Sequence, residues 1–588
     1  MKPFRRSKRT GSWGDPKAFT LKKAYPPGLK GYSEPETGSN HPGNLILSKN
    51  VRLNLLKRET FMSNNTIVIG GTGTGKTFHF ATPNVLQGRT SYLVVDYDGA
   101  IIGNTYSSLQ KNGYDIKVLN LKDLSHSCMY NPFRYIHNED DAITMSTCLL
   151  KTSEDSRLFF NQAKHNLLSS LILYMNDNIS FLSQNFSKLI DLLSLIKTDE
   201  DSPDAKSELD KMFERYEEND PDAAGVKLYK SFRQLDVKSR KASIMSLFMD
   251  LTPFTRSDIR TLTSDDSIYL NEIGDHKQAI FIVVPFNTRM YDKLVALAIT
   301  QAVNIIYKKC ALKDSVAGVE WNGAFHEQTK PFNPDSPDAL IVRSLLDNQL
   351  ELDRTATVCE SGDPLRPYCC KTMNGRPVFY GAAYPEARPA MFETKEQAEY
   401  FLKGIKEGHL SKHNNDICSP VHVIFDGNIA DTCVIPDFKD ILTASLKFSL
   451  FFTIMVQNLH QLSTIFEGDI DTALESCGTL LFFGSNSLDT AEFVSRRLGN
   501  GPDGTPLMPT AEVLKFSSRA PRECLIMASG MPPISDDVFP TPEHPNMDRH
   551  WYSNELDLSL HFKTGKKWDS TPEKSETITM GEPALNKD

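Results

Sequence analysis

The chain has 588 residues, which is too long for one compact core, so two or three domains are expected. Its composition, with 40% hydrophobic and 24% charged residues, is that of an ordinary soluble globular protein. A formal net charge of −9 excludes a broadly basic surface that coats nucleic acid, although a narrow basic channel remains compatible with it.

The N-terminal arm, M-K-P-F-R-R-S-K-R (1–9) and beyond, is rich in Pro, Gly, Lys and Arg. Two interpretations stay open for it. One is a solvated, poorly ordered arm. The other is a polybasic contact with anionic lipid or nucleic acid.

Strands and helices alternate in the next part of the chain. The segments T-I-V-I (66–69), S-Y-L-V-V-D (91–96) and Y-D-I-K-V-L-N-L (114–121) predict strands. A segment of helical length begins at Lys76, between the first two strands. This alternation predicts a mostly parallel α/β sheet.

The segment G-G-T-G-T-G-K-T (70–77) fits the Walker A pattern G-x-x-x-x-G-K-S/T and predicts a phosphate-binding loop. Its glycines allow backbone N–H groups to face the phosphates, and the following helix adds its positive end. We expect Lys76 to meet the β- and γ-phosphates of ATP, and Thr77 to coordinate Mg²⁺. The predicted nucleotide-binding residues are Gly70, Gly71, Thr72, Gly73, Thr74, Gly75, Lys76 and Thr77.

Residues 139–272 have a different pattern of apolar and polar residues. Apolar residues recur there at helical spacing, as in N-Q-A-K-H-N-L-L-S-S-L-I-L-Y-M (161–175), and acidic linkers separate the later segments. This pattern predicts an all-helical domain inserted into the α/β unit. The sheet resumes with Q-A-I-F-I-V-V-P (278–285), whose continuous apolar run suits a strand buried on both faces.

The second half of the chain begins irregularly. Residues 313–418 predict at most a small α+β module, after which strands are predicted at 421–426, 450–456, 479–484 and 523–528. The longest apolar run, F-S-L-F-F-T-I-M-V (448–456), falls well short of the ~20 residues of a membrane span and predicts a buried strand.

The ten cysteines are scattered, and there is neither a C-x-x-C pair nor a secretory leader, so reduced thiols in a cytoplasm are expected. Folding could bring one group of cysteines and histidines together as a metal site, although the spacing of these residues fits no zinc pattern. Its members are Cys359, Cys369, Cys370, Cys418, His409 and His413.

Several of these segments, in this order, resemble one family. The phosphate-loop segment, K-N-G-Y-D-I-K-V-L-N-L-K-D-L (111–124) and Y-N-P-F-R-Y-I (130–136) are similar to the type IV secretion coupling proteins. These are the TraG/TraD-like ATPases of conjugative DNA transfer, and the likeness is greatest to Firmicutes-type members. V-H-V-I-F-D (421–426), V-Q-N-L-H-Q-L (456–462) and H-P-N (544–546) follow in the family's order.

The resemblance implies a RecA-like P-loop NTPase domain with an all-helical insertion. It implies that Asp426 holds the Mg²⁺ water shell and that Gln457 senses the γ-phosphate, so that Lys76, Asp426 and Gln457 form the catalytic set and Thr77 and Asp426 the metal site. The cofactors would be ATP and Mg²⁺. Six copies would form a homomeric or mixed ring that receives relaxase-bound single-stranded DNA and delivers it to the type IV secretion channel at the inner face of the membrane.

Three departures from the family concern the chemistry of ATP hydrolysis. The glutamate that polarises the attacking water is replaced by Gly427. The stretch expected to carry the arginine finger reads T-A-S-L-K-F-S-L (443–450), in which Lys447 is the only cation. The strand end D-P-K-G-E is D-Y-D-G-A (96–100), so a lysine has become Asp98 and a glutamate Ala100.

The expected consequence is a slow enzyme. An arginine finger contributes about 10³–10⁵ in turnover, and general-base assistance about 10²–10⁴. Asp431 and Lys447 could substitute for the lost groups, so a hydrolytically impaired subunit and a working motor both stay open. A P-loop ATPase or kinase unrelated to secretion is the alternative from another class.

The chain begins close to the predicted motor domain, whereas many family members begin with transmembrane helices. We therefore expect a cytoplasmic protein at the periphery of the bacterial cell membrane, with a partner that supplies the membrane association, or else a truncated gene. The predicted parts are a basic arm (1–43), the first half of the nucleotide-binding domain (44–138), the helical domain (139–272), a continuation of the nucleotide-binding domain (273–312), the irregular insert (313–418), its second half (419–550) and a flexible tail (551–588).

Overall fold

The computed structural model describes residues 12–14, 44–55, 63–150, 158–196, 206–286, 288–311, 316–321, 324–327, 357–360, 367–371, 379–380, 388–389, 391–392, 394–407, 409–413, 420–427, 435–445, 450–466, 468–516 and 523–547. The predictions for the first nine residues and for the tail beyond residue 550 lie outside this description. Asp431 and Lys447, named as substitutes in hydrolysis, also lie outside it.

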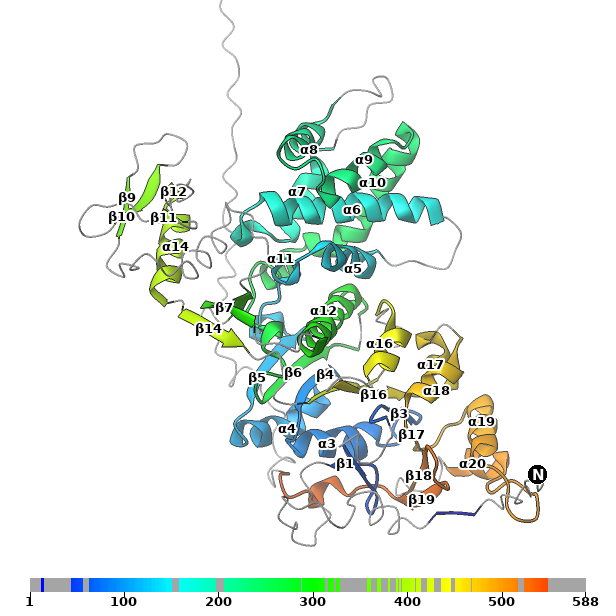
Figure 1. Ribbon diagram of the computed structural model, residues 1–588. Coiled ribbons are helices and arrows are strands. Elements are labelled where there is room, and N and C mark those ends of the chain that lie inside the picture. Colours follow the sequence, from blue (N-terminus) through cyan, green and yellow to red (C-terminus); the bar gives the residue numbers. More distant parts are fainter. Residues whose placement is uncertain are drawn as a thin grey trace, which may run out of the picture.

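A nine-stranded sheet forms the centre of the α/β part (Figure 1), in the order β19-β18-β17-β3-β16-β15-β4-β6-β5. The strands from β17 to β5 run parallel, and β18 and β19 continue the sheet antiparallel. The strands are β3 (Thr66–Ile69), β4 (Ser91–Tyr97), β5 (Asp115–Asn120), β6 (Gln278–Val284), β15 (Val421–Phe425), β16 (Leu450–Val456), β17 (Thr479–Phe482), β18 (Glu523–Ala528) and β19 (Ile534–Asp537).

Helices cover both faces of the sheet, which is why the central strands are apolar on both sides. On one face pack η1, α3 and α4; on the other pack α12 and α16–α18 (Figure 1). The elements are η1 (Thr77–Ala81), α3 (Thr82–Leu86), α4 (Ala100–Lys111), α12 (Asp292–Ala311), α16 (Phe438–Ala444), α17 (Leu459–Ile465), α18 (Ile470–Ser476), α19 (Leu488–Leu498), α20 (Thr510–Phe516) and η8 (Thr541–Glu543).

Between β5 and β6 all described elements are helical, and they lie together beyond one face of the sheet (Figure 1). Their core includes Phe186, whose ring stacks on Phe254 at 3.9 Å between centroids and meets Phe133 edge-on at 5.2 Å. The elements are η2 (Leu124–His126), η3 (Pro132–Tyr135), α5 (Glu139–Leu149), α6 (Leu158–Asn178), η4 (Phe181–Ser183), α7 (Phe186–Ser194), α8 (Glu208–Asn219), α9 (Ala224–Arg233), α10 (Val237–Leu251), η5 (Thr252–Thr255), α11 (Ser257–Leu262) and η6 (Leu270–Glu272).

The helical part is tied to α12 of the α/β part by buried and half-buried polar contacts. Asp250 accepts from Lys164 and from Lys293 of α12, both at 3.0 Å. The Tyr130 hydroxyl donates to Gln301 Oε1 at 2.5 Å. An α/β fold with a mostly parallel sheet and a helical insertion was predicted from the sequence, and this architecture confirms the prediction.

Small sheets occupy the irregular part of the chain and project to one side (Figure 1). One contains β14, β7 and β8, and another contains β13, β10 and β9, next to α14. The elements are β7 (Val316–Trp321), β8 (Ala324–Glu327), β9 (Thr357–Glu360), β10 (Tyr368–Lys371), β11 (Phe379–Tyr380), β12 (Arg388–Pro389), β13 (Met391–Phe392), α14 (Lys395–Glu407) and β14 (His409–His413).

The hypothetical metal site in this part is described only partially. Cys359 and Cys369 are neighbours across β9 and β10, and Cys370 is buried. Cys418 and the side chains of the two histidines of β14 lie outside the description. The hypothesis of a metal site at these residues therefore stays a prediction.

The N-terminal hairpin of β1 (Asn44–Ile46) and β2 (Arg52–Asn54) packs against the last strand of the sheet. The Ser48 hydroxyl donates to Asp536 Oδ2 at 2.5 Å, and the buried Arg52 donates to the Val51 carbonyl at 3.0 Å. Within the described part of the chain, no helix is both long and apolar enough to cross a membrane.

Asn65 connects the start of β3 to its neighbours. Its buried side chain donates to Ser445 Oγ at 2.9 Å and to the carbonyls of Leu442 and Ser476, and it accepts from the Phe452 N–H at 2.9 Å. We expect Asn65→Ala to lower the free energy of unfolding by about 2–4 kcal/mol, because buried partners lose their hydrogen bonds.

Thermal unfolding followed by circular dichroism checks this expectation. The matched control is Asn104→Ala, which removes an exposed hydrogen bond from the Asn104 side chain to the carbonyl of Ala100 in its own helix and should cost less than about 0.5 kcal/mol. Equal melting temperatures for the two variants would contradict the structural role of Asn65.

Candidate nucleotide-binding site

The predicted phosphate loop joins β3 to η1, and its glycines are required by the backbone. Gly75 has φ +84°, in the left-handed region that glycine favours. At Gly70 the restriction is space, because a Cβ atom there would lie 2.6 Å from Thr74 Oγ1 and 2.9 Å from Phe483 Cβ. The loop thus curls tightly at the carboxyl end of β3, where its N–H groups can meet an anion.

Lys76 is buried and folds back into this loop. Its Nζ donates to the carbonyls of Gly70 and Gly71, the latter at 3.1 Å. Burial lowers the pKa of Lys76 to about 8, an effect that nearby Asp426 opposes. An incompletely solvated ammonium inside the loop fits a phosphate ligand, which would replace its contacts with the loop carbonyls.

Thr77 and Asp426 form the second part of the site. The Thr77 hydroxyl contacts both carboxylate oxygens of Asp426, at 3.0 and 2.9 Å. Burial raises the pKa of Asp426 to about 6, against the opposing effects of Thr77 and Lys76. Hydroxyl and carboxylate oxygens are the ligands that Mg²⁺ prefers, so this pair fits the predicted metal site.

The strand order explains how residues 349 positions apart meet. β16 lies between β3 and β15, so the loop after β3, Gln457 after β16 and Asp426 after β15 reach one edge of the sheet. The Gly70 N–H donates to the Val456 carbonyl at 3.0 Å, which places Gln457 beside the loop. The Gln457 N–H in turn donates to Gln461 Oε1 at 2.7 Å.

The phosphate-loop helix starts irregularly. Its first turn, Thr77–Ala81, is π-helical, and only Thr82–Leu86 is α-helical. The C-terminal segment packs on this turn, where the Phe539 carbonyl contacts His79 Nδ1 at 2.9 Å. Asn546, from the H-P-N segment, donates to the Leu86 carbonyl at 2.8 Å. The sequence predicted this helix but not its irregular start.

Asp96, at the end of β4, belongs to the same edge, and the sequence analysis did not single it out as a site residue. Its side chain is fully buried and accepts from the N–H groups of Ile101 and Ile102, at 3.1 and 2.8 Å. Burial raises its pKa to about 7, and the charge of Asp426 adds to this effect. The sequence did contain a pattern that indicates such a site residue, because Asp96 comes at the end of an apolar strand just as Asp426 does.

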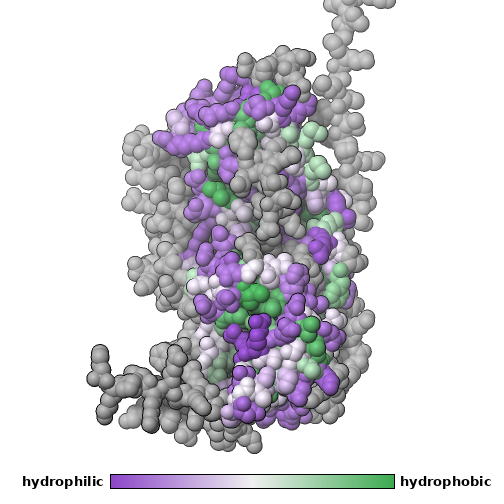
Figure 2. Space-filling view, turned by 90° about the vertical axis from the view of Figure 1, so that its right-hand side faces the viewer, coloured by the Kyte–Doolittle hydropathy of each residue, from purple (hydrophilic) through white to green (hydrophobic). Residues whose placement is uncertain are grey.

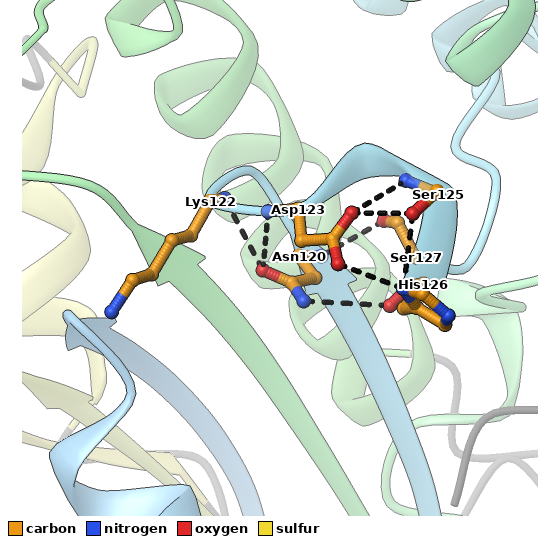
Figure 3. Close-up of polar contacts among 6 residues, drawn as sticks. All are labelled: Asn120, Lys122, Asp123, Ser125, His126 and Ser127. Atoms are coloured by element: carbon orange, nitrogen blue, oxygen red, sulfur yellow. Dashed lines mark hydrogen bonds and ion pairs between the residues drawn. The ribbon is translucent and has the colours of Figure 1, made fainter. Parts of the chain in front are cut away.

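Asp98, two residues further, is held by a loop from β5. It has φ +66°, unusual for a residue other than glycine, and pairs with Lys122 Nζ at 2.8 Å. Asn120 Oδ1 accepts from the N–H groups of Lys122 and Asp123. Figure 3 shows the Lys122 side chain extending away from this network.

The rest of this network is local. Asp123 accepts from the Ser125 N–H and pairs with His126 Nδ1 at 2.7 Å, and Ser127 Oγ accepts from the Asn120 N–H at 2.8 Å (Figure 3). Ser125 also contacts Nδ1 of His126, at 3.0 Å. Because serine and aspartate share one ring nitrogen, the group fixes a turn and does not form a relay from a nucleophile through the ring.

Another titratable cluster lies at the opposite edge of the sheet. Asp115, Glu272 and His276 could meet at one point, but Lys117 Nζ lies 3.4 Å from Asp115 Oδ2. Gln278 Nε2 also donates to that oxygen, at 3.3 Å. A lysine within the group makes a cluster of ion pairs the better explanation than a cation site.

Comparison with known families gives this geometry a context. The model "Type IV secretory system Conjugative DNA transfer" matches residues 37–316, and "TraM recognition site of TraD and TraG" matches residues 420–502. Together they match more than half of the chain. The chain belongs to the conjugative coupling proteins of type IV secretion. This confirms the predicted family, and the narrower likeness to Firmicutes-type members stays a prediction.

Solved structures show the same coupling-protein fold. TrwBdeltaN70, a bacterial conjugative coupling protein, gives a TM-score of 0.53 in its sulphate complex, with 12% sequence identity over 92% of this chain and 95% of that chain. TrwB in complex with ADP and Mg²⁺ gives 0.52, and with the ATP analogue ADPNP 0.50, at the same identity and coverage. No curated protein matches the sequence.

Proposed function

We propose that this coupling protein binds ATP with Mg²⁺ at the loop of residues 70–77 and recruits relaxase-bound single-stranded DNA for delivery to a type IV secretion channel. The observation that carries the proposal is the contact between Thr77 and Asp426 beside a buried Lys76, in a chain that both conjugation models match. The related TrwB structures hold an ATP analogue and ADP with Mg²⁺.

Each residue has a defined task in this site. The loop N–H groups and Lys76 bind the phosphates, while Thr77 and Asp426 hold Mg²⁺ and its water shell. Gln457, beside the loop, senses the γ-phosphate. When bound, Mg²⁺ neutralises phosphate charge.

We further propose that hydrolysis by this chain is slow. The residue after Asp426 is Gly427, which supplies no carboxylate. Asp96 is engaged by two N–H groups and Asp98 by Lys122. ATP would then act mainly to assemble the protein or to gate recruitment of its substrate.

We propose that a second copy of this chain binds the side of the α/β part that carries α17–α19. The copies would form a hexameric ring of identical or mixed subunits. Figure 2 shows apolar side chains gathered part-way down this face among hydrophilic ones. Apolar residues of α17–α19 that keep exposed surface include Leu459, Ile465, Ile470 and Leu488. We propose attachment to the inner face of the membrane through a partner.

The test of this function is ring formation together with DNA binding. With Mg²⁺ and a non-hydrolysable ATP analogue, we expect a hexamer in analytical ultracentrifugation and binding of single-stranded DNA in preference to duplex. Duplex DNA of equal length is the control. A protein that binds the analogue but stays monomeric and does not bind single-stranded DNA would contradict the proposed ring and the proposed recruitment of DNA.

A further inference from the structure

The residue after Asp426 is Gly427, and another side chain already fills the space that a side chain at this position would need. Gly427 has φ +88°, and a Cβ atom there would lie 2.7 Å from Tyr97 Cδ2 and 3.2 Å from its Cγ. These separations are shorter than non-bonded carbon atoms tolerate. Any side chain at position 427 therefore requires the Tyr97 ring to move.

The Tyr97 ring is held in place. Tyr97 is the last residue of β4 and is level with Val284 of β6, while Val95, two residues earlier, is level with Phe425 of β15. Tyr97 is 8% exposed, and its ring stacks on the exposed ring of Phe286, with centroids 5.9 Å apart and planes inclined by 27°. The pairing with β6 fixes the backbone of Tyr97, and displacing its buried side chain would expose apolar surface to water.

The carboxylates described at these strand ends already have partners. Asp96 accepts from two N–H groups, Asp98 pairs with Lys122, and Asp426 contacts Thr77. A general base must have a free lone pair directed at the water that it activates. Each of these three carboxylates could use a remaining lone pair only from the position in which its contact holds it.

We propose that Tyr97 and Gly427 together keep an acidic side chain out of the position from which it would polarise the attacking water. The site then holds ATP with little hydrolysis. The inference rests on the proposed binding of ATP at the phosphate loop. Tyr97 is a positioning residue, because it acts by excluding a base. The glycine and the tyrosine then form a matched pair: a side chain at 427 needs a smaller residue at 97, in addition to the backbone strain that φ +88° imposes.

The experiment compares the wild type with Gly427→Glu, Tyr97→Ala and the double variant, with Tyr97→Phe as the control that keeps the ring. ATP affinity and steady-state ATPase activity are measured with single-stranded DNA present. We expect no gain in turnover from Gly427→Glu alone, and a gain of about tenfold or more in the double variant, below the ~10²–10⁴ of a well-placed base. Tyr97→Phe should match the wild type.

Two results would overturn the inference. One is a Gly427→Glu turnover equal to that of the double variant, because Tyr97 would then not restrict the side chain at position 427. The other is a double variant that binds ATP normally but stays at the turnover of the wild type. A wild type that binds no ATP would refute the proposed function instead.

If the glutamate variants do not fold, a smaller substitution at position 427 tests the inference. Gly427→Ala should lower the melting temperature more with Tyr97 present than in the Tyr97→Ala background, because the clash involves only the Cβ atom. Equal shifts in the two backgrounds would overturn the matched pair.

Discussion

Lys76→Ala is expected to weaken ATP binding by about 10- to 100-fold, because a charge-assisted hydrogen bond to phosphate contributes about 1.5–3 kcal/mol. The ammonium of Lys76 lies inside the loop and is partly desolvated, with its pKa lowered to about 8 by burial. Titration with a fluorescent ATP analogue measures the change.

The matched control is Lys122→Ala. Lys122 also lies at the carboxyl edge of the sheet, but it is exposed and pairs with Asp98. An exposed ion pair contributes at most about 1 kcal/mol, so this variant should keep most of the affinity. Equal losses in both variants would mean that general positive charge, and not the phosphate loop, binds the nucleotide.

Asp426→Asn is expected to abolish most of the Mg²⁺ dependence of ATP binding. A residue that orients the water shell of a metal contributes about 10- to 100-fold to metal affinity. In the wild type, removing Mg²⁺ should therefore weaken ATP binding strongly. In the variant it should have little effect, because the carboxylate that contacts Thr77 has become a neutral amide.

Affinities measured with Mg²⁺ and with a chelator test this expectation. The control is Asp98→Asn, which removes an exposed carboxylate that pairs with Lys122. That variant should respond to Mg²⁺ as the wild type does. A full Mg²⁺ response in Asp426→Asn would place the metal elsewhere.

The local features of the fold could be predicted from the sequence. The strand, glycine loop and helix around Lys76 are adjacent in the chain, and the apolar run before Asp426 ends where the strand ends. Propensity and pattern are local properties, so they define such elements well. The helical segment between β5 and β6 was predictable for the same reason.

The contacts between distant segments could not be predicted in this way. Nothing local shows that β16 inserts between β3 and β15 and so brings Gln457 next to the loop. The burial of Asp96, which raises its pKa to about 7, depends on β15 and on the start of α4. These properties arise only when the sheet is assembled.

One departure from the family is related to a distant residue in a way that the sequence does not show. Gly427 was singled out in the sequence and Tyr97 was not, and the two are 330 positions apart. In the sheet they are neighbours, and the ring of one fills the space beside the other. Pairs of substitutions of this kind become visible only through strand register.

The most direct test of the central claim is paired on one purified sample. ATP affinity is measured with a fluorescent analogue, and steady-state ATPase activity with and without single-stranded DNA, with Lys76→Ala as the blank. We expect ATP binding that Lys76→Ala weakens, together with turnover close to that of the blank. DNA-stimulated turnover that disappears in Lys76→Ala would contradict it and make the protein an active motor.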